Sequence, residues 1–233
     1  MALFPRYEDS EEEFLGSSDA ASRALSVAAV ENDFVEAVYK NIAWFYDLMF
    51  GLSLHSGRLT AVQRMDIKRG DRILEVGVGT GMNISLYPRS CEVIGIDLSN
   101  SMLCKARDRV ARFDARHVQL LQMDAAALEF PDNSFDMVYA PHFINCVPDP
   151  IQVTAEMRRV CRPGGRIIFL NHFLSENPVF SFLERAISPL TVHIGFKSDF
   201  DLPAFLAQAD LKPWSIEKVN IPRVITLVTC VKE

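Results

Sequence analysis

The sequence predicts one α/β domain whose central sheet is mainly parallel. Three observations lead to this prediction. Short, continuous apolar runs recur along the chain, as in strands that are buried on both faces. Stretches of helical period separate these runs, and a glycine-rich segment follows the first of them. With 233 residues, the chain is long enough to build one sizeable hydrophobic core.

The first 28 residues are predicted to form a mobile acidic tail, which leaves residues 29–233 as the domain. Residues 1–20 hold six acidic residues and one basic residue, so they carry −5 of the chain's net charge of −6. The remainder is nearly neutral and lacks the basic surface that nucleic-acid binding requires. The sequence also contains no apolar stretch of about 18 residues and no basic-then-apolar leader. We expect a cytosolic protein that binds no nucleic acid.

An amphipathic helix is predicted over residues 34–52, because apolar residues recur there in steps of three and four. These residues are Phe34, Val38, Ile42, Phe45, Met49 and Leu52. Two roles remain open for their common face. It packs on the sheet and covers the active site, or it inserts into a membrane interface beside Trp44. Gly51 and Gly57 are expected to loosen the chain before the sheet begins.

Five apolar runs predict the parallel strands. They are Ile73–Val76, Val93–Ile96, Val118–Met123, Met137–Ala140 and Ile167–Leu170. Helices are predicted over Ser99–Phe113, which a serine caps, and over Ile151–Cys161, which follows two prolines. The runs Trp214–Val219 and Val224–Val231 have no helix between them and are expected to form an antiparallel hairpin. The five cysteines lack C-x-x-C spacing and are expected to be reduced core residues.

The motif Glu75-Val-Gly77-Val-Gly79-Thr-Gly81 lies between the first predicted strand and an expected helix. Glycines allow a tight turn and let a ligand approach the backbone closely. Asp97 ends the second strand, where a carboxylate can accept both hydroxyls of a ribose, and Asp124-Ala125 closes the third. These features predict a nucleotide site. Purely structural roles stay open, since the loop is also a possible plain turn and both aspartates are possible helix caps.

Three details separate this pattern from dinucleotide-binding domains. The glycines follow G-x-G-x-G, an acid precedes the first glycine by two residues, and Asp124-Ala125 ends the third strand. Together they resemble the class I S-adenosylmethionine-dependent methyltransferases over roughly residues 72–171. The stretches Phe130-Pro-Asp-Asn-Ser-Phe-Asp136 and Arg162-Pro-Gly-Gly165 belong to the resemblance. It implies a Rossmann-like fold with a mainly parallel seven-stranded sheet, an antiparallel C-terminal hairpin and helices on both faces.

The resemblance also implies the cofactor, S-adenosylmethionine, and roles for individual residues. Glu75 is expected near the methionine amino group, Asp97 at the ribose, and Asp124-Ala125 at the adenine. The residues expected to bind the cofactor are Tyr46, Glu75, Gly77, Gly79, Gly81, Asp97, Leu98, Met102, Asp124, Ala125 and Ala140. Methyl transfer from a sulfonium is an in-line displacement, so the protein mainly positions the acceptor and excludes water. We expect no metal.

Segments outside the cofactor frame resemble the soluble, Rhodobacter-type phosphatidylethanolamine N-methyltransferases of bacteria. The matching pieces are Tyr46-Asp-Leu-Met-Phe-Gly51, His55-Ser-Gly-Arg58, Val147-Pro-Asp-Pro150, Asn171-His-Phe173, Ser175-Glu176, Gly195-Phe196 and Asp199-Phe200. This resemblance, over about residues 34–211, implies a lipid amine as acceptor and peripheral association with the inner face of the membrane. The acidic tail departs from the family.

Several of these pieces recur in methyltransferases that act on quinones, so a quinone precursor or a soluble amine remains an alternative acceptor. Two further alternatives belong to other functional classes. One is a methyltransferase-like interaction module, which the intact glycine loop with Asp97 and Asp124 disfavours. The other is an NAD-dependent oxidoreductase, for which the sequence shows no recognisable substrate domain.

Polar residues at the expected methyl-transfer site are Tyr39, Tyr46 and His142, which we predict to be catalytic. Tyr39 and Tyr46 are seven residues apart and share one helix edge, whereas His142 follows the fourth strand at the ligand-binding edge of the sheet. The predicted substrate-binding residues are Tyr39, His142, Asn171, His172, Arg185 and Lys197, the last two for a phosphate. An ammonium has no lone pair, so the neutral amine is expected to react.

Overall fold

The computed structural model describes residues 55–175, 177–178, 181–182, 185, 188, 197, 199–219 and 225–233. The predicted acidic tail at residues 1–28 and the predicted helix at residues 34–52 lie outside this set, so both stay predictions. The same holds for Tyr39 and Tyr46.

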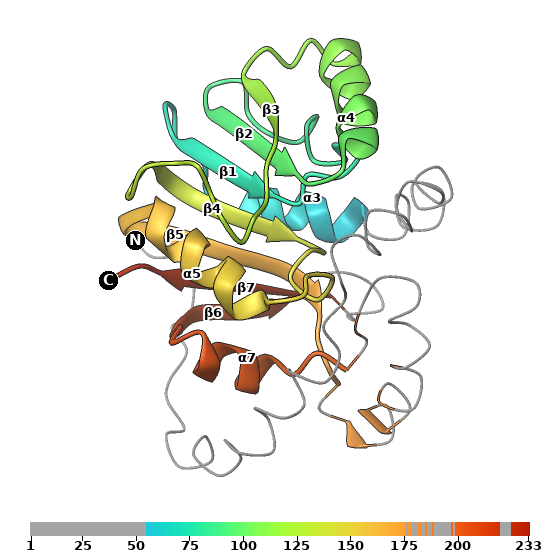
Figure 1. Cartoon of the computed structure of the whole chain (residues 1–233), viewed down its shortest axis with the longest axis vertical. Coiled ribbons are helices and arrows are strands. Elements are labelled where there is room, and N and C mark those ends of the chain that lie inside the picture. The colour runs from blue at the N-terminus through green and yellow to red at the C-terminus, as the bar shows by residue number, and fades with distance from the viewer. Residues whose placement is uncertain are drawn as a thin grey trace.

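The core of the fold is a seven-stranded sheet in the order β3-β2-β1-β4-β5-β7-β6 (Figure 1). The strands are β1 (Arg72–Val76), β2 (Glu92–Asp97), β3 (Val118–Gln122), β4 (Phe135–Pro141), β5 (Cys161–His172), β6 (Pro213–Lys218) and β7 (Ile225–Val231). Neighbouring strands from β3 to β5 are parallel, while β7 runs antiparallel to both β5 and β6. This arrangement confirms the predicted mainly parallel sheet with an antiparallel C-terminal hairpin.

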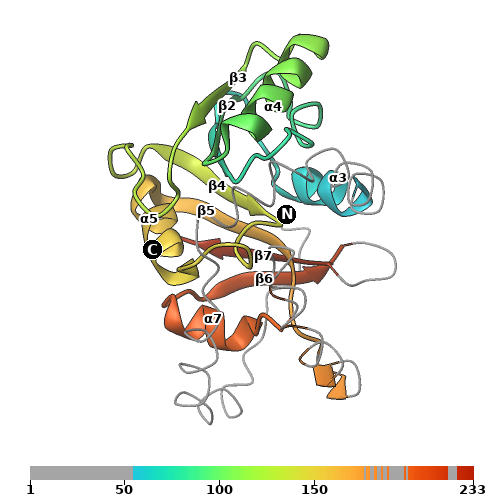
Figure 2. The same cartoon turned by 45° about the vertical axis from the view of Figure 1, so that its right-hand side comes forward.

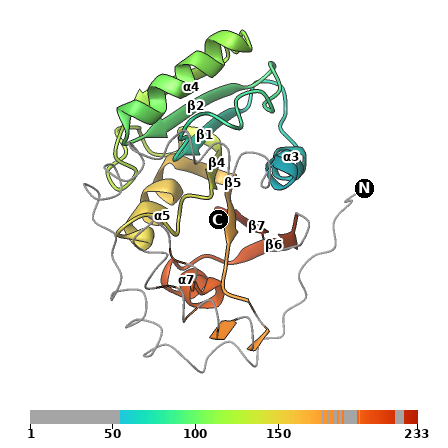
Figure 3. The same ribbon diagram turned by 90° about the vertical axis from the view of Figure 1, so that its right-hand side faces the viewer.

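Helices cover both faces of the sheet. The helices α3 (His55–Arg64) and α4 (Asn100–Arg112) contribute to one buried cluster, together with β-strand residues such as Ile73 and Tyr139. The helices α5 (Pro150–Val160) and α7 (Leu202–Gln208) pack on the opposite face, against Val138 and Phe169. Figure 2 and Figure 3 show α3 on one side of the strands and α5 and α7 on the other. The strands β1, β4 and β7 are therefore buried on both faces, which explains their mostly apolar sequences.

The predicted helix starts are confirmed by their caps. Ser99 is the N-cap of α4 and its hydroxyl accepts from the Met102 N–H. Asp149 is the N-cap of α5, where Oδ1 accepts from the N–H groups of Ile151 and Gln152. In both cases a side-chain oxygen satisfies a backbone donor that has no partner within the helix.

The prediction that Gly57 loosens the chain is wrong, because Gly57 lies inside α3. Gly57, Arg58, Ala61 and Val62 are the buried residues of this helix and form one stripe. Contacts between this stripe and the sheet outweigh the low helix propensity of a single glycine.

The helix expected directly after the glycine motif is absent from that segment, since residues 80–86 form consecutive turns. Hydrogen bonds of the i→i+3 type link Val78 to Gly81, Gly81 to Ile84, and Asn83 to Leu86. Gly81 has a φ of +82°, which interrupts a right-handed helix. The turns direct Asn83 and Tyr87 inward, where both contact Glu75.

Strand β5 begins earlier than predicted, at Cys161, and includes an irregularity at the predicted glycine turn. Cys161 pairs with Phe135, and the next paired residues are Arg166 and Met137. Four residues of β5 therefore lie opposite one residue of β4, and Gly164 adopts a φ of +72° among them. Four of the five cysteines are buried as expected, but Cys104 on α4 is exposed, which corrects the prediction for that residue.

Candidate active site

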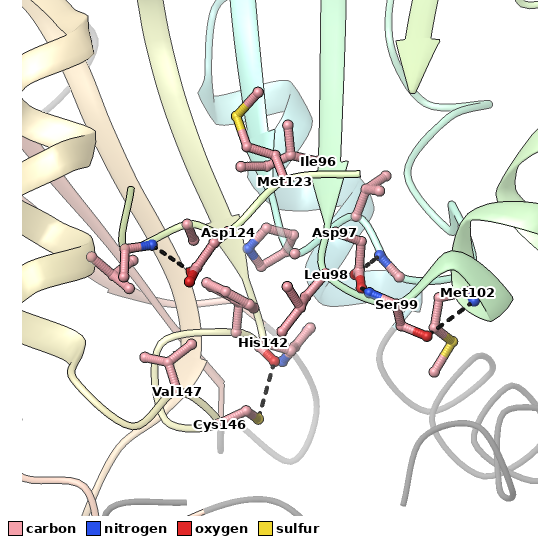
Figure 4. Close-up of a pocket in the computed structure, with 18 of the residues that line it drawn as sticks. Ile96, Asp97, Leu98, Ser99, Met102, Met123, Asp124, His142, Cys146 and Val147 are labelled. Atoms are coloured by element: carbon pink, nitrogen blue, oxygen red, sulfur yellow. Dashed lines mark hydrogen bonds between the residues drawn. The ribbon is translucent and has the colours of Figure 1, made fainter. Parts of the chain in front are cut away.

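A cavity opens at the carboxyl ends of the parallel strands, the edge where open α/β sheets bind ligands. The ends of β2 and β4 and the segments after β1, β2, β3 and β4 line it, with one residue each from α3, α4 and α5. The lining residues are Arg58, Gly77, Val78, Gly79, Thr80, Met82, Ile96, Asp97, Leu98, Ser99, Met102, Met123, Asp124, Ala125, Ala126, Pro141, His142, Phe143, Cys146, Val147, Pro148, Asp149 and Val153. Figure 4 shows Asp97 and Asp124 on opposite sides, with His142 between them in that view.

The three glycines of the loop after β1 have positive φ angles but different surroundings. A Cβ on Gly77 would lie 2.1 Å from the Phe143 ring, and one on Gly81 would lie 2.4 Å from Ile84 Cδ1. A Cβ on Gly79 would meet no atom within 4 Å. The backbone at Gly79 is therefore open toward the cavity, as close approach of a cofactor requires, while Gly77 and Gly81 serve internal packing.

Asp97, at the end of β2, is held in place by two backbone donors. The Gly79 N–H donates to Oδ2 at 2.8 Å and the Ser99 N–H donates to Oδ1 at 2.9 Å. These two hydrogen bonds fix the orientation of the carboxylate. The N-cap of α4 is Ser99, so Asp97 is not the helix cap. Its position and orientation fit a group that accepts ribose hydroxyls.

The loop after β3 supplies the opposite wall. Asp124 Oδ1 accepts from the Ala126 N–H at 2.8 Å, which makes a tight turn of the segment that follows. Leu98 and Met102 add apolar surface from the β2–α4 segment. Of the predicted cofactor residues, the structure brings Gly77, Gly79, Asp97, Leu98, Met102, Asp124 and Ala125 together around the cavity. It does not place Glu75, Gly81 or Ala140 on the lining.

Glu75 is buried behind the glycine loop rather than exposed to the cavity, with 1% of its surface accessible. Its Oε1 accepts from Asn83 Nδ2 at 2.6 Å, and its Oε2 accepts from the Tyr87 hydroxyl at 2.7 Å. Burial raises the pKa of Glu75 from 4.5 to about 7, although both hydrogen bonds and the nearby Arg58 charge oppose the rise. Burial and the Glu75 charge also raise the pKa of Tyr87 well above 10, so this phenol stays a donor.

Arg58 enters the site from α3 and is 6% exposed. It lines the cavity, and its Nη1 lies 3.4 Å from Asn83 Oδ1. Sequence reasoning did not assign a role to Arg58, Asn83 or Tyr87. Their contacts with one another and with Glu75 span 8 to 25 residues of sequence, which no local pattern encodes.

His142 follows β4 directly and lines the cavity, as expected for a residue at this edge. Its φ is +54°, and its N–H donates to the Leu170 carbonyl at 2.6 Å, which fixes the turn. Nε2 is buried and has no hydrogen-bond partner. Burial, with a smaller contribution from the Arg58 charge, holds the pKa of His142 well below its usual value. The imidazole is therefore neutral at physiological pH and able to accept a proton or a hydrogen bond.

Of the other predicted substrate residues, Tyr39 lies outside the described residues, and Asn171, His172, Arg185 and Lys197 do not line this cavity. Asn171 is fully buried at the end of β5, and neither polar atom of its side chain has a partner. His172 points to the opposite face of the sheet, because side chains alternate along a strand. Lys197 is 5% exposed and its N–H donates to the Asn145 carbonyl, whereas Arg185 is exposed.

Comparison with known proteins identifies the family. A family model described as a methyltransferase domain matches residues 74–169. Phosphatidylethanolamine N-methyltransferase of Cereibacter sphaeroides is 39% identical over 184 residues, which cover 78% of this chain and 90% of that protein. Demethylmenaquinone methyltransferase of Shouchella clausii is 33% identical over 192 residues, which cover 77% of this chain and 80% of that protein.

The fold also matches a solved structure, that of Haemonchus contortus phosphoethanolamine N-methyltransferase 2 in complex with S-adenosyl-L-methionine. The TM-score is 0.68 at 19% identity, over 86% of this chain and 59% of that one. At this identity, the likeness concerns the fold. Sequence identity to the curated relatives and the sheet topology together show that the chain belongs to the S-adenosylmethionine-dependent methyltransferases.

Proposed function

We propose that the chain transfers methyl groups from S-adenosylmethionine to the amine of phosphatidylethanolamine and its mono- and dimethylated forms, toward phosphatidylcholine. The observation that carries this proposal is that the chain is more similar in sequence to a phosphatidylethanolamine N-methyltransferase than to a demethylmenaquinone methyltransferase. Identity is 39% with the phosphatidylethanolamine enzyme, of which the chain covers 90%, and 33% with the menaquinone enzyme, of which it covers 80%.

The cavity supports a defined placement of the cofactor. Asp97 accepts the ribose hydroxyls, because its carboxylate is held toward the cavity by Gly79 and Ser99. Asp124 and Ala125 meet the adenine on the opposite wall, where Leu98 and Met102 provide apolar contacts. The open backbone at Gly79 lets the cofactor approach the loop after β1. When bound, the cofactor supplies the electrophilic methyl group.

His142 provides a neutral acceptor for the reacting amine. An ammonium has no lone pair, so the amine must release a proton to water before its nitrogen can take up the methyl group that the cofactor would supply. The buried Nε2 of His142 has no protein partner and accepts an N–H of the amine, which holds the nitrogen in line. Its low pKa keeps the imidazole uncharged, which avoids repulsion of the sulfonium and of the ammonium product.

Residues outside the cavity lining extend the proposal. Tyr39 and Tyr46, on the predicted helix at residues 34–52, complete the methyl-transfer site, and the apolar face of that helix contacts the membrane surface. Asn171, His172, Arg185 and Lys197 lie outside the cavity lining, and a role for them at the headgroup stays a prediction. Among the described residues, no helix combines the length and apolar character needed to cross a bilayer.

A quinone precursor is the second candidate acceptor, because a demethylmenaquinone methyltransferase is 33% identical. The two are separated by supplying S-adenosylmethionine with a deuterated methyl group to the purified full chain. Vesicles contain either phosphatidylethanolamine with phosphatidylglycerol, or phosphatidylglycerol with a demethylated quinone. Mass spectrometry is expected to find the label on the ethanolamine headgroup, and an Asp97→Ala variant controls for background. Label on the quinone ring alone would refute the proposal.

A further inference from the structure

Arg58 places a positive charge in the interior without a matching negative charge in contact. The side chain is 6% exposed and lies in the buried stripe of α3 with Gly57, Ala61 and Val62. Its Nη1 donates to Asn83 Oδ1 at 3.4 Å, and Nε is buried with no partner. Within the described part of the chain, no carboxylate lies within ion-pair distance of this guanidinium. A guanidinium has five donors, and burying it unpaired is costly.

The groups around Arg58 do not supply the missing anion. Asn83 stands between Arg58 and Glu75, accepting from the former and donating to the latter. Glu75 does not contact the guanidinium, since its two carboxyl oxygens accept from Asn83 and Tyr87, and burial raises its pKa to about 7. Tyr139 is buried with an unpartnered hydroxyl, and His142 is neutral. Arg58 therefore faces the cavity with donors that a bound ligand is able to fill.

We propose that Arg58 is the anion-binding residue of the cofactor site and that its guanidinium binds the carboxylate of the methionyl group of S-adenosylmethionine. The location supports a cofactor anion. Arg58 lines the cavity together with Thr80 and Met82 of the segment after β1, while Asp97 and Asp124 mark the ribose and adenine sides. The methionyl end then extends toward β1. Arginine suits a carboxylate because its planar fork makes two parallel hydrogen bonds.

This inference rests on the cofactor placement proposed above and is independent of the methyl acceptor. The test compares S-adenosylhomocysteine with its decarboxylated analogue, which keeps the amine and lacks the carboxylate. Binding of both to the full chain is measured by calorimetry in the absence of lipid, so a negative result leaves the lipid question unaffected. The wild-type protein is expected to bind S-adenosylhomocysteine about 10- to 100-fold more tightly than the analogue.

Arg58→Met is expected to weaken S-adenosylhomocysteine by about the same factor while changing the analogue less than about threefold, as a direct contact requires. Arg58→Lys keeps the positive charge but lacks the planar guanidinium, so its affinity for S-adenosylhomocysteine is expected to lie between those of the wild type and Arg58→Met. Arg64→Met is the matched control, since Arg64 lies on the same helix but is largely exposed and pairs with Glu217 at 3.2 Å. This variant is expected to bind both ligands as the wild type does.

Three results would overturn the proposal. Equal weakening of both ligands by Arg58→Met would show that Arg58 acts only through the fold. Unchanged affinity for S-adenosylhomocysteine, with a raised KM for phosphatidylethanolamine vesicles, would assign Arg58 to the acceptor phosphate instead. If Arg58→Met does not fold, the wild-type comparison still decides, because a preference below about threefold for the carboxylate-bearing ligand contradicts the contact.

Discussion

Replacing Glu75 with glutamine is expected to remove a pH-dependent cost of folding. The unfolded carboxyl ionises near 4.5, whereas the buried one ionises near 7. Between these values the folded state retains a proton that the unfolded state has lost, so the free energy of unfolding falls as pH rises and levels off above about pH 7. Each pH unit in this interval is worth about 1.4 kcal/mol. Between pH 5 and pH 8, the wild type should therefore lose about 2 to 3 kcal/mol through this one group.

The assay is urea unfolding followed by circular dichroism at several pH values from 5 to 8. The difference between Glu75→Gln and the wild type isolates Glu75, because all other titrating groups are common to both. We expect the variant to gain about 2 to 3 kcal/mol relative to the wild type across this range. Glu129→Gln alters an exposed carboxyl and is the matched control, with a profile parallel to the wild type. Parallel profiles for Glu75→Gln and the wild type would refute the inference that burial suppresses ionisation.

Three further predictions concern the cofactor and the chemistry. Asp97→Ala should weaken binding of S-adenosylhomocysteine by about 1 to 3 kcal/mol, since ribose hydroxyls lose their acceptor; unchanged affinity in calorimetry contradicts this assignment. Gly79→Ala should lower cofactor affinity more than Gly81→Ala does, because a Cβ on Gly79 would occupy open space in the cavity. Gly81→Ala should mainly lower the melting temperature, because its Cβ would meet Ile84. The reverse ranking of the two affinities would contradict this prediction. Turnover at saturating lipid should rise from pH 6 to pH 9 as the amine deprotonates, and Tyr46→Phe should reduce turnover more than cofactor affinity. A pH-independent chemical step with full activity in Tyr39→Phe, Tyr46→Phe and His142→Ala would remove these residues from the mechanism.

The strands and helix caps could be predicted because the physics behind them is local. Strands buried on both faces, such as Ile73–Val76 and Ile167–Leu170, need unbroken apolar sequence and so stand out. Ser99 predicts the start of α4 because its hydroxyl can satisfy a backbone donor three residues away, and two prolines predict the start of α5. The structure adds Asp149 as the N-cap of α5. The cavity also lies where the pattern predicts it, at the carboxyl ends of these strands.

What sequence reasoning missed depends on contacts between distant residues. The turns after the glycine loop follow from the positive φ of Gly81 and place Asn83 against Glu75. Helix α3 forms although it contains Gly57, because its buried stripe packs on the sheet. Arg58 then reaches Asn83, 25 residues away in sequence. Asn171 has the predicted position at the end of β5, but only the structure shows that it is fully buried and away from the cavity lining.

The most direct test of the proposed activity is mass spectrometry of total lipids from a bacterial host that makes phosphatidylethanolamine but no phosphatidylcholine. Expression of the full chain is expected to produce headgroups that carry one, two or three added methyl groups. The Asp97→Ala variant, expressed at the same level, should produce far less. An unchanged lipid profile in cells whose quinone precursors gain a methyl group would contradict the account and identify the chain as a quinone methyltransferase.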